Sequence, residues 1–436
     1  MYELDKENAP PVGVLVAVQT RDIDDDALRA SLSELRRLAK TFGIEVVRQE
    51  SQRLPGIGKA MYLGPGKVEE LKLVIEELRE EHRDRPVVVI ADDELSPWQN
   101  RKLADALGVD DLMDRTELIL EIFHRHARSR EARAQVELVR LAYQAPRLRE
   151  RRKGGDAGRV RGGGKGAGES ALELGRRQIR DRMAALRHEL EEIGRERDIQ
   201  RARRGDLRCV ALVGYTNAGK STLMRVLTGS DVYVEDKLFA TLDATIRTLE
   251  PSVTPRILVS DTVGFIRKLP HDLVASFKST LDAALEARLL LHVVDASDPD
   301  CRIHIETTLA VLNEIGAGDI PMRYLFNKID RVEDPAILDV LRAEHPHGLF
   351  VSAHDPADVA RVHELIVATF QGERQEHTLR IAPAQGAIRA LIFEQCEVLD
   401  ETWDAEGGVF QVRATPVVID TITRKLAEQT APTRRR

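Results

Sequence analysis

Cysteine and long apolar runs are both scarce in this sequence. Its three cysteines, Cys209, Cys301 and Cys396, lie far apart without C-x-x-C spacing, which argues against a disulfide framework or a zinc site. The apolar runs at residues 12–18 and 289–294 are too short for a signal peptide or a membrane-spanning helix. We therefore expect a soluble cytoplasmic monomer that does not insert into a membrane, while a peripheral position at a membrane stays open.

A glycine-rich turn between an expected strand (residues 209–213) and an expected helix (residues 221–228) matches the pattern G-x-x-x-x-G-K-[ST]. In such a loop, glycines let backbone N–H groups surround phosphates at the positive end of a helix dipole. Lys220 should reach the β and γ phosphates, and the Ser221 hydroxyl should bind Mg²⁺. The predicted phosphate-binding residues are Gly214, Tyr215, Thr216, Asn217, Ala218, Gly219, Lys220, Ser221 and Thr222.

A second motif of the same site follows the apolar run at residues 257–260 and consists of Asp261, Thr262, Val263 and Gly264. The Asp261 carboxylate can hold Mg²⁺ through water, and the Gly264 N–H can meet the γ phosphate. Between the two motifs, a threonine of the first switch should close on Mg²⁺ when the γ phosphate is present. Thr241 and Thr245 both qualify by position.

The motif N-K-x-D at residues 327–330 follows a further strand-like run, residues 322–326, and predicts guanine selectivity. The Asp330 carboxylate can accept from N1–H and the 2-amino group of guanine, whereas adenine offers neither donor. A buried polar group left unpaired costs about 1–3 kcal/mol, and a charge costs more. Asn327 should tie this loop to the phosphate loop, and the stem of Lys328 should flank the base. The remaining residues expected at the guanine are Ser352, Ala353 and His354, where a backbone N–H can meet O6.

These motifs in this order predict that the chain binds and hydrolyses GTP with Mg²⁺. Glutamine, however, is absent from the position after Gly264, where many GTPases use it to orient water. Phe265 stands there, and an aromatic ring cannot orient water by hydrogen bonding. We therefore expect slow hydrolysis by the chain alone and stimulation by a partner. Packing of Phe265 against the switch helix is an alternative role, and the two roles are compatible.

Two long helical patterns flank a basic, glycine-rich stretch. Apolar residues recur at helical spacing from Arg115 to about Arg152 and from about Glu169 to Arg204, which predicts an antiparallel arm. Residues 151–168 are too rich in glycine for a helix, and their charge suits RNA phosphates. The stretch lacks aromatic side chains, which argues against base stacking. The candidate RNA contacts are Arg151, Arg152, Lys153, Arg159, Arg161 and Lys165; a solvated flexible linker is the alternative.

The sequence predicts an α/β fold on both sides of this arm. Alternating strands and helices, one of them capped by Ser96 with Pro97 at its first position, indicate a small α/β domain with a parallel sheet. After the P-loop GTPase domain, three short strands and two helices indicate a small α+β domain. The expected bounds are 1–115 for the N-terminal domain, 116–205 for the helical arm, 206–371 for the GTPase domain and 372–436 for the C-terminal domain.

A shorter glycine–lysine turn lies in the N-terminal domain, between a strand expected at residues 60–63 and a helix. Its residues Gly64, Gly66 and Lys67 could form a second anion or nucleotide site. Because G-x-G-K alone is a weak motif, a glycine turn with a solvated lysine is at least as compatible with the pattern.

The whole chain resembles the HflX family of ribosome-associated GTPases. The resemblance rests on residues 62–67 (YLGPGK), 114–123 (DRTELILEIF), 135–138 (QVEL), 214–221 (GYTNAGKS), 239–243 (FATLD) and 261–265 (DTVGF). The family places the Mg²⁺ threonine of the first switch third in F-A-T-L-D. This implies Thr241 among the switch residues Phe239, Ala240, Thr241, Leu242 and Asp243. The family also carries a hydrophobic residue where Phe265 stands.

The resemblance implies binding to the large (50S) ribosomal subunit and its rRNA, with the arm tip near the peptidyl-transferase region, ribosome-stimulated hydrolysis and splitting of stalled ribosomes. It leaves open ATP binding by the N-terminal domain through Lys67. Two stretches depart from the family pattern: residues 166–177 lack its proline, glutamine and aspartate, and residues 243–247 read DATIR instead of DPTTR. Two alternatives therefore stand beside this interpretation: a GTP-regulated dormancy or assembly factor that binds RNA or the ribosome without splitting it, and a signalling GTPase that recognises a protein through its C-terminal domain.

Overall fold

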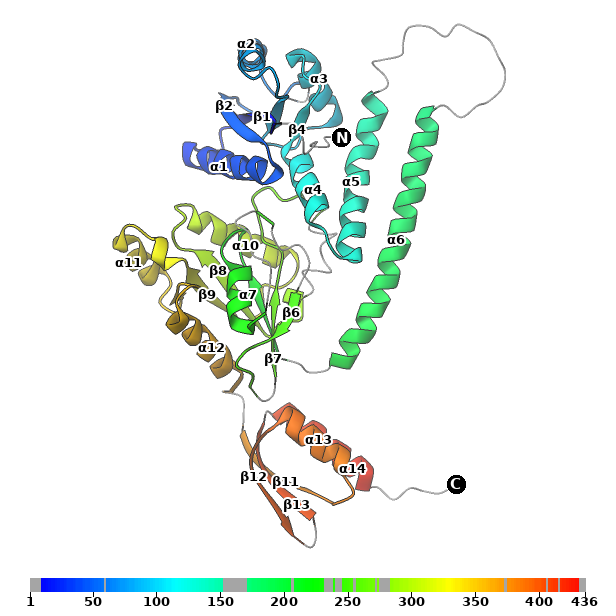
Figure 1. The fold of residues 1–436 in the computed structure, drawn as a ribbon, viewed down its shortest axis with the longest axis vertical. Coiled ribbons are helices and arrows are strands. Elements are labelled where there is room, and N and C mark those ends of the chain that lie inside the picture. Colours follow the sequence, from blue (N-terminus) through cyan, green and yellow to red (C-terminus); the bar gives the residue numbers. More distant parts are fainter. Residues whose placement is uncertain are drawn as a thin grey trace, which may run out of the picture. The chain divides into compact units, whose positions relative to one another are not determined.

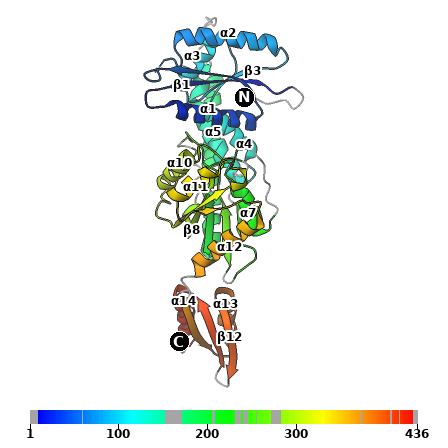
Figure 2. The ribbon, with the colours of Figure 1, turned by 90° about the vertical axis from the view of Figure 1, so that its left-hand side faces the viewer.

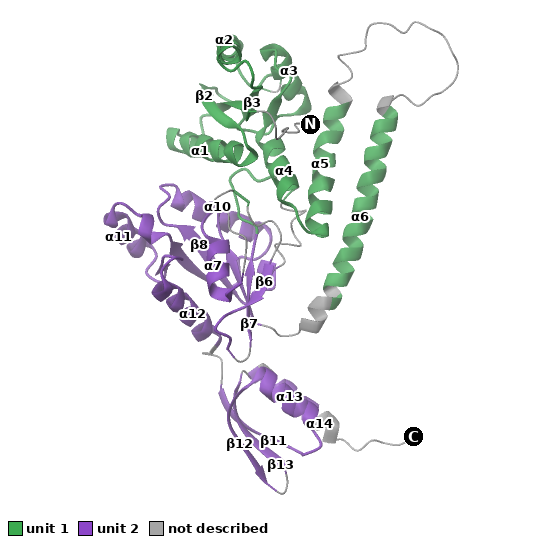
Figure 3. Cartoon of the chain, viewed as in Figure 1, with its two compact units in different colours: residues 1–203, 235–243, 263–281 green, residues 204–234, 244–262, 282–436 purple. Residues whose placement is uncertain are grey.

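Helices and strands alternate along most of the chain, which confirms the predicted α/β fold (Figure 1). The computed structural model describes residues 9–58, 60–151, 171–204, 208–230, 238–239, 245–253, 256–270, 273, 283–371, 375–404, 407–414 and 416–430. The chain divides into two compact units (Figure 3). Unit 1 holds residues 1–203, 235–243 and 263–281, and unit 2 holds residues 204–234, 244–262 and 282–436.

Unit 1 begins with a parallel sheet that is covered by helices on both faces. The strands are β1 (Val12–Gln19), β2 (Glu45–Arg53), β3 (Val87–Ala91) and β4 (Leu112–Asp114), and the helices are α1 (Asp25–Phe42), α2 (Pro65–Glu81), α3 (Pro97–Leu107) and α4 (Arg115–His126). The strand order is β2-β1-β3-β4. Val14, Val16 and Val18 of β1 share a core with Leu71 and Ile75 of α2, while α1 covers the other face (Figure 2). Such double cover is typical of parallel sheets.

One strand predicted in this domain is wrong. Residues 60–63 form bends and irregular backbone, because the buried Tyr62 is held through its side chain and not through a β-ladder. Its hydroxyl accepts from the Val18 N–H at 3.2 Å and donates to Asp93 at 2.7 Å. The prediction that Ser96 caps α3 is confirmed: its hydroxyl accepts from the Gln99 N–H, and the Gln99 side chain accepts from the Ser96 N–H.

The arm consists of two antiparallel helices, α5 (Arg130–Arg151) and α6 (Ala171–Arg204), which lie in unit 1 except for the last residue of α6. Ion pairs join the helices in antiparallel order, with Arg130 to Glu189 at 2.6 Å and Arg182 to Glu137 at 2.7 Å. Exposed pairs of this kind contribute about 0–1 kcal/mol each, so they orient the helices more than they stabilise them.

The continuous helix predicted from residue 115 to residue 152 is wrong, since the chain breaks between α4 and α5. Ala127 has extended backbone, and the Ser129 hydroxyl accepts from the Ala132 N–H at 3.0 Å. Serine at a helix start satisfies one of the donors that the first turn leaves without a partner. Apolar spacing continues across this break, which explains why periodicity alone gave one helix.

The GTPase part of unit 2 is a six-stranded sheet with helices around it. The strands are β5 (Arg208–Val213), β6 (Thr245–Thr248), β7 (Ile257–Asp261), β8 (Leu289–Asp295), β9 (Met322–Asn327) and β10 (Leu349–Phe350). The helices are α7 (Lys220–Thr228), α10 (Cys301–Glu314), the short η1 (Ile329–Arg331), α11 (Pro335–Glu344) and α12 (Pro356–Gln371). The order is β10-β9-β8-β5-β7-β6, and of these strands β6 alone runs antiparallel. The loops that follow β5, β7 and β9 therefore meet at one edge of the sheet.

The chain closes with a small antiparallel sheet and two helices, as the sequence predicts. These elements are β11 (Gln375–Ile381), α13 (Gly386–Gln395), β12 (Glu397–Asp404), β13 (Gly407–Ala414) and α14 (Pro416–Thr430). The strand order is β11-β13-β12, so β12 lies at an edge of the described sheet. The core of this part includes Ile388, Ile392, Phe410 and Ile422.

Candidate nucleotide site and the switch contacts

The loop between β5 and α7 has two positions where only glycine fits. Gly214 has φ +145°, and a Cβ placed there would lie 2.2 Å from the carbonyl oxygen of Val293. Gly219 has φ +97°, and its Cβ would lie 2.2 Å from Nδ2 of Asn327. Both glycines let the loop press against β8 and the N-K-x-D motif, as expected when backbone must approach other backbone closely.

Lys220 turns back into this loop. Its Nζ donates to the carbonyl oxygens of Gly214 at 3.0 Å and Tyr215 at 2.8 Å. Burial lowers the pKa of Lys220 to about 8; Asp261 acts in the opposite direction, and Lys328 lowers the pKa further. A buried ammonium held by neutral carbonyls is poised to meet a polyphosphate, which would stabilise the charged form.

Ser221 and Asp261 bring two oxygen ligands together beside the loop. The Ser221 hydroxyl donates to Oδ2 of Asp261 at 2.7 Å, and Asp261 is fully buried at the end of β7. The next residue, Thr262, donates to the Leu212 carbonyl at 2.7 Å and fixes β7 beside β5. Hydroxyl and carboxylate oxygens are ligands that Mg²⁺ prefers, so this pair fits the metal that the sequence predicts.

The N-K-x-D motif after β9 contacts both the phosphate loop and the loop after β10. Asn327 donates through Nδ2 to the Ala218 carbonyl at 2.9 Å and accepts through Oδ1 from the Ala353 N–H at 3.0 Å. Lys328 donates to the Asn217 carbonyl at 2.6 Å and lies 2.7 Å from Asp295. The phosphate loop and the loop after β10 are therefore held to one another through a single asparagine and its neighbour.

Asp330 lies in η1 beside the loop that follows β10. A hydrogen bond with the Ser352 side chain is the main cause that lowers the pKa of Asp330, so the carboxylate is charged at neutral pH. Ser352 is itself oriented, because its N–H donates to Asp358 at 2.8 Å and its hydroxyl accepts from the His354 N–H at 3.3 Å. Two further predicted residues of this edge, Thr216 and Thr222, lie in the phosphate loop and in the first turn of α7.

Some predicted site residues belong to unit 1, and others lie outside the residues that the structure describes. Val263 and Gly264 follow Asp261 and Thr262 in sequence but belong to unit 1. Ala240, Thr241, Leu242 and Asp243 lie outside the described residues, as do Arg152, Lys153, Arg159, Arg161 and Lys165 of the arm tip. Arg151 is the last residue of α5. Their proposed roles stay predictions.

The segment after Gly264 is bound to the N-terminal domain within unit 1, a feature that sequence reasoning missed. Lys268 Nζ donates to Asp92 Oδ2 at 2.7 Å and to Asp93 Oδ1 at 2.6 Å. The Arg267 N–H donates to Glu34 at 3.3 Å. We call this set of contacts the switch clamp. Each of these bonds joins residues between 175 and 233 positions apart in sequence, so no local pattern could indicate it.

A buried arginine organises the carboxylates of the switch clamp. Arg115, only 1% exposed, contacts Asp92 at 2.8 Å and also pairs with Glu34. Ser31 donates to the second oxygen of Asp92 at 2.7 Å. Removing one partner of a buried ion pair leaves an uncompensated charge, which costs about 3–5 kcal/mol. The Glu34 and Asp92 carboxylates are therefore held by residues of α1 and α4 as well as by the segment after Gly264.

Aromatic packing accompanies the switch clamp. Phe239 of the first switch packs on Phe123 of α4, with ring centroids 4.4 Å apart, and the Leu238 N–H donates to the Thr41 hydroxyl at 3.3 Å. Phe265 is 1% exposed. This burial agrees with a packing role for Phe265, while slow hydrolysis by the chain alone stays a prediction.

The glycine–lysine turn of the N-terminal domain has a different structure from the phosphate loop. Lys67 donates to Glu50 at 2.6 Å and to Glu70 at 2.9 Å, and its side chain is 14% exposed. Burial lowers its pKa, but the hydrogen bonds to the two carboxylates outweigh burial and the net shift is upward. Gly64 precedes α2, and its N–H donates to the Gln52 side chain at 2.8 Å. The lysine is thus bound to acidic side chains of its own domain.

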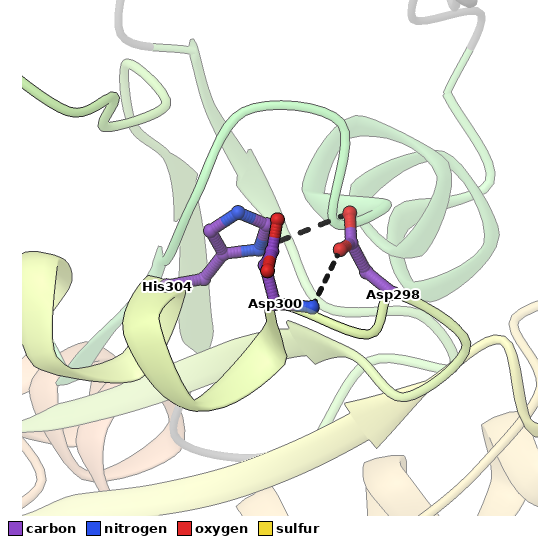
Figure 4. Close-up of side chains that lie close together, drawn as sticks. All are labelled: Asp298, Asp300 and His304. Carbon is purple, nitrogen blue, oxygen red and sulfur yellow. Dashed lines mark hydrogen bonds and ion pairs between the residues drawn. The ribbon is translucent and has the colours of Figure 1, made fainter. Parts of the chain in front are cut away.

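Three further side chains with metal-binding chemistry lie at the start of α10 (Figure 4). Ligand atoms of Asp298, Asp300 and His304 lie within 4.8 Å of one another. Asp298 accepts from the Asp300 N–H at 3.0 Å, and the His304 ring stacks on Tyr215 of the phosphate loop at 3.7 Å. The turn that begins α10 accounts for their closeness, and their spacing in D-x-D-x-x-x-H is the signal that sequence reasoning passed over.

Comparisons with known proteins cover nearly the whole chain. Residues 29–124 match the family model described as "GTP-binding GTPase N-terminal", residues 126–204 match "GTP-binding GTPase Middle Region", and residues 209–328 match "50S ribosome-binding GTPase".

No helix among the described residues is long and apolar enough to cross a membrane.

Curated relatives agree with these matches. "GTPase HflX" of Gluconacetobacter diazotrophicus is 50% identical and the alignment covers 97% of this chain and 99% of that protein. "GTPase HflX" of Escherichia coli is 37% identical, with 98% and 97% covered. Among solved structures, a GTP-binding protein from Sulfolobus solfataricus in complex with GDP is 22% identical, with a TM-score of 0.42, and the match covers 82% of this chain and 99% of that one.

Proposed function

Because this chain belongs to the HflX family of GTPases and hydrolyses GTP, we propose that it does so on the large ribosomal subunit and uses the hydrolysis to separate stalled ribosomes. The match of residues 209–328 to a family described as 50S ribosome-binding GTPases is the observation that carries the choice of partner. The two helices of the arm, with a basic sequence between them, support an rRNA contact by charge.

The nucleotide pocket supports GTP chemistry through residues that are already held in place. Lys220 and the N–H groups of the loop around it would meet the phosphates, and the Ser221 hydroxyl with Asp261 would hold Mg²⁺. When bound, the metal offsets negative charge on the phosphates. Thr241 completes this set in our proposal, as the family pattern implies.

Guanine selectivity in this proposal comes from Asp330. Ser352 hydrogen-bonds this carboxylate and Asn327 ties the neighbouring loops together, which supports a role for the two carboxylate oxygens as acceptors for N1–H and the 2-amino group. Adenine offers this carboxylate neither donor, so bound ATP would leave it with the Ser352 hydrogen bond alone, which disfavours ATP.

Phe265 supports the proposal that hydrolysis depends on the partner. Its burial leaves no side chain at this position to orient water, so a ribosome-bound state would have to supply or order the missing group. The ribosome would then act as the trigger and not merely as the place of hydrolysis.

The experiment compares GTP hydrolysis by the chain alone and with purified 50S subunits, for the intact protein and for a variant with residues 154–168 shortened. We expect stimulation by the subunit that depends on these residues. Sucrose-gradient sedimentation of 70S ribosomes with GTP then tests splitting. A chain that binds 50S subunits without dissociating 70S particles would support a dormancy or assembly factor, and a chain insensitive to both would support the signalling alternative.

A further inference from the structure

The C-terminal part of unit 2 carries two exposed aromatic side chains that are fixed in position. Phe393 of α13 is 45% exposed and Trp403 of β12 is 48% exposed. Trp403 donates through Nε1 to Glu401 at 2.7 Å. Its ring covers Gly408, where an added Cβ would lie 2.9 Å from the indole, and it meets Phe410 edge-on at 6.1 Å. The indole is thus held in one orientation while half of it stays open to solvent.

An arginine joins these two rings. The Arg389 guanidinium lies 5.3 Å from the Phe393 ring and 5.8 Å from the Trp403 ring, and it donates to Glu401 at 2.9 Å. Tryptophan and arginine that are rigid before binding lose little conformational entropy on contact, which is why they are frequent anchors of protein interfaces. We call Phe393, Trp403 and Arg389 the aromatic cluster.

The strand beside the aromatic cluster has an open edge. In the order β11-β13-β12, β12 has a hydrogen-bonded neighbour on one side only among the described strands. Backbone N–H and C=O groups along such an edge can pair with an extended segment of another chain, and neighbouring side-chain pockets then select the segment.

Charge identifies the kind of segment. Residues 393–404 contain five acidic residues and no lysine or arginine: Glu394, Glu397, Asp400, Glu401 and Asp404. Arginines of neighbouring elements pair with three of them, through Arg380 to Asp404, Arg389 to Glu401 and Arg413 to Glu397. The remaining negative charge repels RNA phosphates, and it also repels the same acidic edge of a second copy of this chain.

We propose that α13 and β12 form a docking surface for an extended, cationic segment of another protein, which pairs with the edge of β12 and places an apolar side chain on the aromatic cluster. This inference does not depend on the proposed ribosome function, because it rests on contacts within the C-terminal part alone.

The two tryptophans of the chain allow a matched test in the full-length protein. Trp98 and Trp403 are equally exposed, at 48%. The variant Trp98→Phe leaves Trp403 as the sole tryptophan, and the variant Trp403→Phe leaves Trp98. A ten-residue peptide of alternating lysine and valine is the probe; an alternating glutamate–valine peptide and oligouridylate are the comparison ligands.

We expect the lysine–valine peptide to change Trp403 emission in a saturable, salt-sensitive way and to leave Trp98 emission unchanged. In the Trp98→Phe background, Phe393→Ala, or Glu394→Lys together with Asp400→Lys, should raise the peptide Kd at least about tenfold. Glu76→Lys with Glu80→Lys on α2 makes the same change in net charge and should have no effect. Retained GDP binding and circular dichroism establish that each variant is folded.

Three results with the ligands would overturn the proposal, and so would a fourth without any ligand. These are Trp403 emission that does not respond to the lysine–valine peptide, an equal response to the glutamate–valine peptide, and a response to oligouridylate, which would make the surface a nucleic-acid site. Emission that depends on protein concentration in the absence of peptide would point to a second copy of the chain as the occupant and would overturn it as well.

Discussion

The loop before α7 and the turn before α2 both place glycines and a lysine at the start of a helix, yet the two lysines have opposite surroundings. Lys220 is buried among neutral carbonyls, and its pKa is lowered to about 8. Lys67 is held by Glu50 and Glu70, and its pKa is raised. An incoming polyphosphate would complete the first arrangement, whereas it would have to displace two carboxylates from the second.

The partners of the lysine, more than the glycine pattern, thus decide whether such a turn can bind an anion. Gly214 and Gly219 have positive φ and allow contact with β8 and Asn327. Gly66 meets no atom within 4 Å of an added Cβ, and Gly64 would meet only the Gln52 side chain. The turn before α2 thus lacks the tight backbone packing of the phosphate loop.

The largest expected effect tests the first of these turns. Lys220→Ala removes the buried cation that meets the phosphates, so GDP and GTP affinity should fall by more than about 100-fold, the order expected for a lost interaction between opposite charges in a buried site. Titration with a fluorescent guanine nucleotide measures the change. Lys67→Ala is the matched control and should bind GTP as the unaltered chain does. Loss of GTP binding in Lys67→Ala but not in Lys220→Ala would contradict the prediction.

A smaller effect, of about tenfold or more, is expected from Asp330→Asn. The amide removes one acceptor for guanine and offers a donor, so GTP affinity should fall while xanthosine triphosphate, which has a carbonyl in place of the 2-amino group, should gain. Competition between the two nucleotides gives the ratio. Unchanged GTP preference would remove Asp330 from the base pocket.

The lowered pKa of Lys220 also predicts that the free energy of unfolding depends on pH. Lys220 loses its proton near pH 8 when folded but near its ordinary value of 10.5 when unfolded, so the unfolded chain binds more protons between these values and stability rises with pH. Relative to Lys220→Met, the nucleotide-free chain should gain about 2 kcal/mol between pH 7.5 and pH 9.5. Urea unfolding at the two pH values measures it; a gain of equal size in Lys220→Met would exclude Lys220 as the cause.

The smallest expected effect concerns Lys67. Its partly buried pairs with Glu50 and Glu70 should contribute about 1 kcal/mol, and Lys67→Ala should lower the thermal midpoint by a few degrees. Glu70→Gln, which keeps the Glu50 pair, should lower it less. If Lys67→Ala also abolishes ATP binding measured by calorimetry, the turn before α2 is a nucleotide site despite its carboxylates.

Much of the fold could be predicted because its signals are local. Apolar runs gave strands such as β3 and β5, and Ser96 followed by Pro97 gave the start of α3. The N-K-x-D loop could be placed beside the phosphate loop because loops at the carboxyl edge of a parallel sheet converge. The break at Ala127 was missed, although Ser129 carried a capping signal, because continuing apolar periodicity was given more weight.

The features that could not be predicted are contacts between residues that are far apart in the sequence. Nothing in the sequence near Lys268 indicates that it contacts Asp92, and the position of Arg115 in the sequence indicates only the start of a helix. The aromatic cluster is similar, because Arg389 and Trp403 meet only when α13 packs beside β12. Such pairs follow from tertiary packing, which overrides local propensity.

The division of the chain into units passes between Thr262 and Val263, within a single motif. On one side of that peptide bond is the strand that ends in Asp261; on the other, six residues lead to Lys268 and its carboxylates. Both carboxylates that hold Lys268 belong to the same unit as Lys268 itself. A shift of residues 263–268 away from the N-terminal domain would therefore have to break these two bonds, so the switch clamp is the contact that such a motion has to overcome.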